Sequence, residues 1–165
     1  MKTIALLSDT HGYWDPRFPS LLEGVDQIWH AGDIGTMEVA EQLSAIAPLM
    51  AVHGNVDGGD LRLMYPELLR FRVEEVEVMI KHIGGYPGHY DRSVYAKLLK
   101  DPPQLFVSGH SHILKVMYDK ELNLLHLNPG AAGLQGWQQV RTMLRFVIDG
   151  REIRDLDIME LSSRA

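Results

Sequence analysis

Seven residues with nitrogen or oxygen donor atoms stand just after short apolar segments of the chain. The first segment, Thr3 to Leu7, leads through Ser8 into Asp9 and His11, and four later segments end in the same way. These segments are too short for helices of ordinary length, so we interpret them as buried strands. The seven donors are Asp9, His11, Asp33, Asn55, His82, His110 and His112.

Such a set of donors suits a pair of metal ions. Open α/β sheets place ligand sites at the carboxyl ends of strands, so strands that share sheets would bring the donors to one edge. Imidazoles and carboxylates suit manganese, iron, zinc or nickel, whereas a site made only of oxygen would suit magnesium or calcium. Seven donors are more than one tetrahedral ion can bind, but they suit two ions that share a carboxylate. Two ions about 3.5–4 Å apart clamp both oxygens of an in-line displacement at phosphorus, so the donors predict phosphate ester hydrolysis.

The charge of the chain agrees with a metal-dependent reaction. The formal net charge is −6 and no basic cluster stands out, so we expect no binding to bulk nucleic acid. The side chains supply no visible positive centre for a phosphate, whereas two divalent ions beside two aspartates would. Metals also lower the pKa of bound water, so no side-chain nucleophile is needed and cysteine, which is absent, is excluded.

Length and composition predict one cytoplasmic domain. The 165 residues suit a single domain over 1–165, with a frayed end at 162–165. The absence of cysteine fits a reducing compartment. The first apolar run is interrupted by Asp9 and His11, so it does not read as a signal peptide, and no run reaches membrane-spanning length. We expect a small phosphate-ester substrate, no membrane partner, and a homodimer or homotetramer.

The order of the expected elements indicates an α/β fold. Strands near 3–7, 27–31 and 49–54 alternate with helices at 16–24 and 37–47, which predicts a parallel β-α-β unit with right-handed crossovers. Thr36 is the expected cap of the second helix. The rest of the chain is expected to form a helix at 92–100 and strands at 68–73, 76–83, 105–108, 113–118, 122–127, 142–148 and 152–158, the last four as antiparallel hairpins.

The donor motifs together resemble a known signature. They read Asp9-Thr10-His11, Gly32-Asp33, Gly54-Asn55-Val56-Asp57, His82 and Gly109-His110-Ser111-His112. Their order and spacing resemble D-x-H, G-D, G-N-x-[DE], H and G-H-x-H of the calcineurin-like metallophosphoesterases, over roughly Met1 to Asp157. Asn128-Pro129-Gly130 further resembles the N-P-G of the small YfcE-like phosphodiesterase branch of bacteria and archaea.

This resemblance implies a fold and a site. The fold would be a two-sheet β-sandwich flanked by helices, with two divalent metals at one edge. The metal is often manganese in the family, and iron, zinc, nickel or magnesium are the alternatives. The ligand sets carried over by position are Asp9, His11 and His112 for the first metal, and Asn55, His82 and His110 for the second. Asp33 would bridge the metals and hold the attacking hydroxide.

Two departures from the family pattern bear on the substrate. Many members have a histidine at the position of Val56 that protonates the leaving group, and valine cannot transfer a proton. We therefore expect diesters or activated aryl esters in preference to alkyl monoesters. The branch often has a second histidine where this chain has Gly84. His89, on the loop 84–91, is a candidate to fold back over the site and contact the substrate together with Asn55.

The sequence leaves other functions and other histidines open. A fold relative serves as a non-catalytic subunit of the retromer coat, so an interaction scaffold is the alternative function, although such a protein is expected to have lost metal ligands. A phosphoprotein phosphatase is disfavoured by Val56 and by the short chain. His30, inside an expected strand, and His126 are interpreted as structural, whereas His53 can point either way.

Overall fold

Two five-stranded sheets form the centre of the structure, a computed structural model that describes residues 1–163 and the side chains as far as residue 161. The first sheet has the order β12-β11-β1-β2-β3 and the second β4-β5-β8-β10-β9. The strands are β1 (Lys2–Leu7), β2 (Gln27–His30), β3 (Leu49–Ala51), β4 (Leu68–Val73), β5 (Val76–Lys81), β6 (Gly85–Tyr86), β7 (His89–Tyr90), β8 (Leu105–Val107), β9 (Lys115–Asp119), β10 (Leu124–Asn128), β11 (Val140–Asp149) and β12 (Glu152–Ser163). The helices are α1 (Phe18–Leu21), α2 (Met37–Ile46), α3 (Asp60–Met64) and α4 (Arg92–Lys100).

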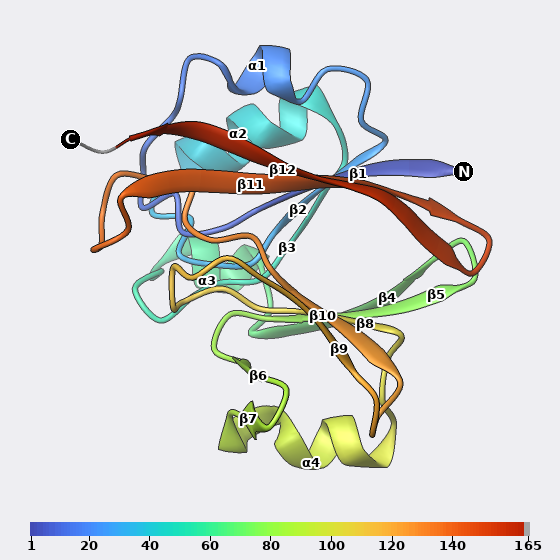
Figure 1. Ribbon diagram of the computed structural model, residues 1–165. Helices are drawn as coiled ribbons and strands as arrows, with labels where there is room; N and C mark the ends of the chain where they lie inside the picture. The colour runs from blue at the N-terminus through green and yellow to red at the C-terminus, as the bar shows by residue number, and fades with distance from the viewer. Residues whose placement is uncertain (164–165) are drawn as a thin grey trace.

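The sheets pack face to face, with helices on their outer faces. Figure 1 shows α1 and α2 over the first sheet and α4 against the second. In β1, Ile4 and Leu6 belong to the core between the sheets, whereas Ala5 and Leu7 pack with the residues of α1 and α2. Because side chains alternate along a strand, the unbroken apolar run from Ile4 to Leu7 is what a strand segment buried on both faces requires. The predicted two-sheet fold flanked by helices is confirmed.

The predicted strand directions are also confirmed. β1, β2 and β3 are parallel, and Thr36 caps α2 by accepting a hydrogen bond from the amide of Val39. The C-terminal hairpins β9-β10 and β11-β12 are antiparallel, and β11 pairs with β1. The N-terminal strand β1 thus lies in the middle of the first sheet, between β11 and β2.

Three local predictions differ from the structure. The helix expected at 16–24 is only the four-residue α1, which begins beside Pro19, because proline fits the first turn of a helix but not its interior. The loop expected at 84–91 contains the small hairpin β6-β7. The end expected to be frayed continues as β12, where residues 162 and 163 pair with β11, and 164–165 lie outside the described residues.

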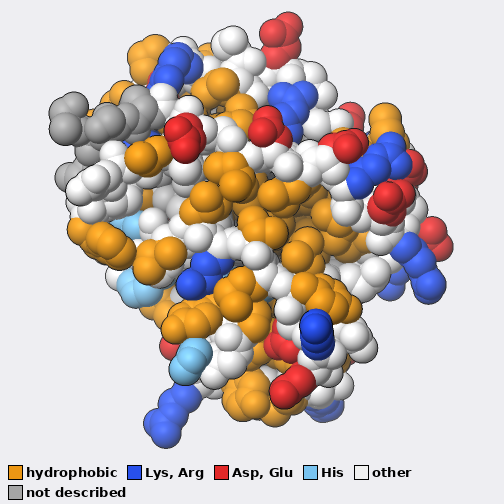
Figure 2. Space-filling view, in the orientation of Figure 1, with side chains coloured by type: hydrophobic (Ala, Val, Ile, Leu, Met, Phe, Trp, Pro, Cys, Tyr) orange, Lys and Arg blue, Asp and Glu red, His pale blue; other side chains and the backbone are white. Residues whose placement is uncertain are grey.

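Two features of the described residues bear on possible partners. None of their helices combines the length and the apolar character that a bilayer-crossing helix needs. On the face drawn in Figure 2, their lysine and arginine side chains are interspersed with acidic ones. The expectations about membranes and nucleic acid stay predictions.

His126 is a buried histidine of β10 with one hydrogen bond. Its Nδ1 lies 3.1 Å from the carbonyl oxygen of Phe106, and its Nε2 has no partner among the described residues. Burial lowers the pKa of His126 from 6.5 to about 4. Between these values the unfolded chain binds a proton that the folded chain does not bind. Stability therefore falls as the pH falls through this window.

We predict that this histidine makes the protein sensitive to acid. Between about pH 7.5 and about pH 5, protonation of His126 in the unfolded chain should lower the free energy of unfolding by about 2 kcal/mol. The His126→Leu variant should lack this part of the loss, measured by urea unfolding of chelator-treated protein at both pH values. His89→Ala, which removes an exposed histidine, is the control. An equal pH-dependent loss in His126→Leu and the parent would contradict the prediction.

Candidate metal centre

The turns that carry the candidate ligands meet at one edge of the sandwich. Asp9 and His11 follow β1, and Asp33 follows β2. These turns extend the parallel pairing, because the backbone amides of Asp9 and His11 donate hydrogen bonds to the carbonyl oxygens of Gly32 and Asp33. In the second sheet, β5 and β8 are parallel and lead to the remaining histidines. The structure thus brings together all seven donors, which also include Asn55, His82, His110 and His112.

The backbone at these turns is unusual. Eight non-glycine residues in the described part of the chain have a positive φ, and five of them are candidate ligands, with φ between 47° and 68°. This conformation costs of order 1–3 kcal/mol for a residue with a side chain, and it persists where surrounding structure fixes it. It turns the chain sharply at the strand end and directs successive donors to one point. The five are Asp9, His11, Asp33, His110 and His112.

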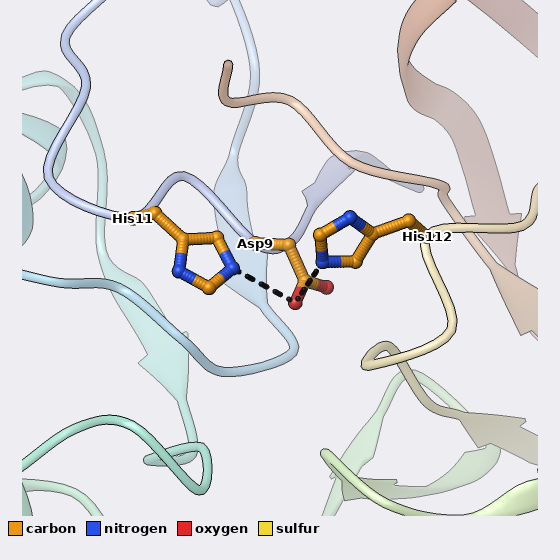
Figure 3. Close-up of side chains that lie close together, drawn as sticks. All are labelled: Asp9, His11 and His112. Atoms are coloured by element: carbon orange, nitrogen blue, oxygen red, sulfur yellow. Dashed lines mark ion pairs between the residues drawn. The ribbon is translucent and has the colours of Figure 1, made fainter. Parts of the chain in front are cut away.

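The donors form two groups of three. Asp9, His11 and His112 make the first group, and their ligand atoms lie within 4.8 Å of one another. The Asp9 Oδ1 atom lies 3.6 Å from His11 Nε2 and 3.1 Å from His112 Nε2, as the dashed lines in Figure 3 mark. The second group, which meets the same limit, consists of Asp33, His82 and His110.

These separations fit metal coordination. Donors that lie about 2.0–2.2 Å from one ion are about 3–3.5 Å apart at neighbouring positions around it. Asp9 Oδ1, His11 Nε2 and His82 Nε2 are buried and have no hydrogen-bond partner among the described residues. Buried polar atoms are nearly always satisfied, so three unpaired ligand atoms facing one another need an explanation. A bound cation supplies it, and the donor set therefore fits metal ions.

Asp33 lies between the two groups. Its Oδ2 is 3.1 Å from His82 Nε2 in the second group and 3.6 Å from His11 Nε2 in the first. Its other oxygen accepts a hydrogen bond from the amide of Val56. Asn55 joins the second group, because its Oδ1 lies 3.1 Å from His110 Nδ1. The geometry leaves one oxygen of Asp33 directed at both groups.

Both aspartates are held in the ionised form. Burial opposes ionisation of Asp9, but contacts with His11 and His112 outweigh it, so its pKa lies well below the ordinary value. Burial likewise opposes ionisation of Asp33, and the contact with His82 overcomes it and lowers its pKa. Two buried carboxylates are therefore available as anionic ligands.

Two histidine ligands are oriented by partners on their other nitrogen. His82 Nδ1 lies 2.7 Å from the carbonyl oxygen of Ala31, directly after β2, and this oxygen can only accept a hydrogen bond. His112 Nδ1 lies 2.9 Å from Oε1 of Gln138, whose amide nitrogen donates to the carbonyls of Gly133 and Gln135. Both rings thus carry a proton on Nδ1, so Nε2 is the nitrogen that would present a lone pair to a metal ion.

Gln138 and Asp57 are functional residues that the sequence alone did not assign. The Asp57 carboxylate accepts amide hydrogen bonds from Ile34, Gly35 and Gly54, which ties the turn of Asp33 to that of Asn55. Asp57 belonged to the recognised motif, so that signal was present in the sequence. Gln138 follows a glycine-containing loop at a distance from every motif, and no sequence signal identified it.

The other histidines are placed as follows. His30 is buried and accepts the amide hydrogen bond of Gly32 on Nδ1, while its Nε2 contacts the hydroxyl of Thr10, so the structural interpretation is confirmed. His53 hydrogen-bonds the carbonyl of Tyr65 through Nδ1 and contacts Arg62 through Nε2. His89, on β7, lines a cavity that also contains His110.

Comparisons with known proteins decide the family. Residues 1–151 match the calcineurin-like phosphoesterase superfamily domain. The chain belongs to this superfamily. A probable metallophosphoesterase of Methanocaldococcus jannaschii is 31% identical over 135 residues, which cover 78% of this chain and 67% of the relative.

Solved structures show the same phosphoesterase fold. An archaeal phosphodiesterase superposes with a TM-score of 0.74 at 19% identity and covers 96% of this chain and 99% of its own. Vps29 of Chaetomium thermophilum superposes with a TM-score of 0.76 at 15% identity, with coverage of 97% and 95%. At these identities the likeness concerns the fold. Metal-dependent phosphoester chemistry is the activity of the family, and this chain has residue groups suited to metal.

We predict that divalent metal stabilises the folded protein through these groups. Manganese at about one hundred times its dissociation constant should raise the free energy of unfolding by about 2.7 kcal/mol. Asp9→Asn should lose most of this gain, because a neutral amide is a weaker ligand in a buried site. Asp155→Asn, at an exposed carboxylate, should keep it. Chemical unfolding with and without manganese measures the effect, and equal stabilisation of Asp9→Asn and the parent would contradict it.

Proposed function

We propose that this protein hydrolyses phosphodiesters with two divalent metal ions, manganese foremost, held by the seven donors. The observation that carries the proposal is the set of unpaired, buried ligand atoms directed at one another at the edge of the sandwich. When bound, two such ions polarise the phosphoryl group and make hydroxide available as a nucleophile near neutral pH. Asp33, whose Oδ2 lies close to both groups, would be the ligand shared by the ions and would help to hold the attacking hydroxide.

The two hydroxyl groups that flank Asp9 in the sequence are committed to hydrogen bonds. Ser8 donates its hydroxyl hydrogen to Asp9 Oδ2, and Thr10 donates to the carbonyl of Ile34, and both residues are fully buried. The chain contains no cysteine. These facts favour attack by water-derived hydroxide over attack by a side chain.

Leaving groups of low pKa are the preferred ones. Val56 is 57% exposed beside Asn55, at the position from which a histidine would protonate the departing oxygen. A general acid contributes typically 10²–10⁴-fold, so its absence penalises alkyl leaving groups most. Aryl diesters need no such proton.

We predict a substrate preference that follows from this. Metal-loaded protein should hydrolyse bis(4-nitrophenyl) phosphate with a kcat/KM about a hundredfold or more above that for an alkyl phosphate monoester. Asp33→Asn should abolish both reactions, and Asp155→Asn should leave both unchanged. Equal rates on the two esters would contradict the role given to Val56, and no hydrolysis at all would contradict the proposed function.

His89 is proposed to contact the substrate. It lines a cavity of about 260 Å³ together with His110, Tyr86 and Lys115, and its ring lies 5.0 Å from that of Tyr86. An ester substituent of the substrate that extends from the metal centre into this cavity would contact the imidazole.

Removing this imidazole should therefore weaken substrate binding. We predict that His89→Ala raises KM for an aryl diester about fivefold, the effect of one lost hydrogen bond, with little change in kcat. Steady-state kinetics on metal-loaded protein measure both values, and Glu121→Ala, an exposed change, is the control. Kinetics of His89→Ala identical to the parent on every ester would rule the contact out.

A non-catalytic scaffold is the second candidate. The superposition on Vps29 favours it, because that protein shares the fold over nearly the whole chain. The convergence of all seven donors favours the enzyme. Bound metal with hydrolysis of an aryl diester would decide for the enzyme, and absence of both for the scaffold. The cytoplasmic location and the homo-oligomeric state expected from the sequence stay predictions.

A further inference from the structure

A second cavity opens beside the metal centre, on the side of Arg62 and Lys81. It has a volume of about 150 Å³, and its walls include Asn55 and His82, two of the candidate metal ligands. Because these two residues line the cavity as well as the centre, a group bound in the cavity is next to any phosphoryl group bound at the metals. The other polar side chains in its walls are His53, Arg62, Glu67 and Lys81.

Arg62, on α3, brings a fixed positive charge to this cavity. Its guanidinium donates hydrogen bonds to the carbonyl oxygens of Asp57, Asn55 and Gly54 and contacts His53 Nε2 at 3.3 Å. Among the described residues no carboxylate lies within ion-pair distance of it. These four contacts leave at least one of its five N–H groups for a ligand. The charge is therefore held in place by neutral acceptors and is not compensated.

Lys81 adds a second, more buried cation. It is 6% exposed, and its Nζ lies 3.2 Å from the carbonyl oxygen of Ile83. Its ion pair with Glu67 is long, at 3.7 Å, and the Glu67 side chain is 71% exposed, so water screens that carboxylate. Two cations and one screened anion leave the cavity positive. The sequence showed no such positive centre, because these residues converge only in the folded chain.

We propose that this cavity binds a second anionic group of the substrate. The inference rests on the proposed function and narrows it: the preferred diester carries a phosphate or carboxylate on one of its ester arms. A guanidinium and an ammonium that share a cavity match such oxygens, with arginine giving the directed hydrogen bonds and lysine the point charge. Glu67 at the rim weakens the attraction and lowers the affinity for the anionic arm.

The test compares two diesters that differ only by a phosphate group on one of the two ester substituents. The 4-nitrophenyl ester of thymidine 5′-phosphate is used with and without a 3′-phosphate, on metal-loaded protein. The parent should prefer the 3′-phosphorylated ester about tenfold in kcat/KM, the effect of one charge-assisted hydrogen bond. Arg62→Gln should bring this ratio close to one, Glu67→Gln should raise it, and Arg151→Gln, at an exposed arginine, should leave it unchanged. Because the ratio is read within each variant, a general loss of activity does not affect it.

A binding measurement tests the anion site independently of ester hydrolysis. Chelator-treated protein is titrated with inorganic phosphate by calorimetry, which needs neither metal nor turnover. Glu67→Gln should bind phosphate more tightly than the parent and Arg62→Gln more weakly. This order without any ester hydrolysis would support the anion site and overturn the proposed function. A ratio of one in the parent, or phosphate binding equal in all variants, would overturn the anion site.

Discussion

The structure depends on a buried carboxylate that faces three imidazoles. Asp9 is fully buried; its Oδ2 accepts hydrogen bonds from the Ser8 hydroxyl and the His110 amide, while its Oδ1 has no hydrogen bond among the described residues. An ionised carboxylate in such surroundings is costly unless positive charge lies beside it. Strands of both sheets end at this point, so the folding of each sheet supplies part of what stabilises Asp9.

The centre is held by interactions between the two sheets and by interactions among the turns of the first sheet. His82, which follows a strand of the second sheet, hydrogen-bonds Ala31, directly after β2 of the first, and Asp57 joins the turns of the first sheet. A Cβ added at Gly54 would lie 2.1 Å from Asp33 Oδ1, so only glycine allows that close approach. Left-handed backbone at five ligands is tolerated because this packing fixes it, and the ligands are held in position before any metal binds.

Local signals in the sequence predicted the elements and the donors, but not their neighbours. Apolar runs that end in Asp9 or His110 indicated buried strands with donors at their ends, and Thr36 marked a helix start because capping is a contact between residues close in sequence. Gln138 and Arg62 act through contacts made only after folding: Gln138 orients His112, and Arg62 meets Lys81 in a cavity. Neither residue belongs to a periodic pattern or a motif, so their roles depend on the tertiary structure.

The most direct test of a two-metal centre is anomalous scattering from crystals of the manganese-loaded protein. We expect two anomalous peaks about 3.5–4 Å apart, one beside Asp9, His11 and His112, the other beside His82 and His110, with Asp33 in contact with both. A single peak, peaks elsewhere in the molecule, or no peak after full metal loading would contradict it.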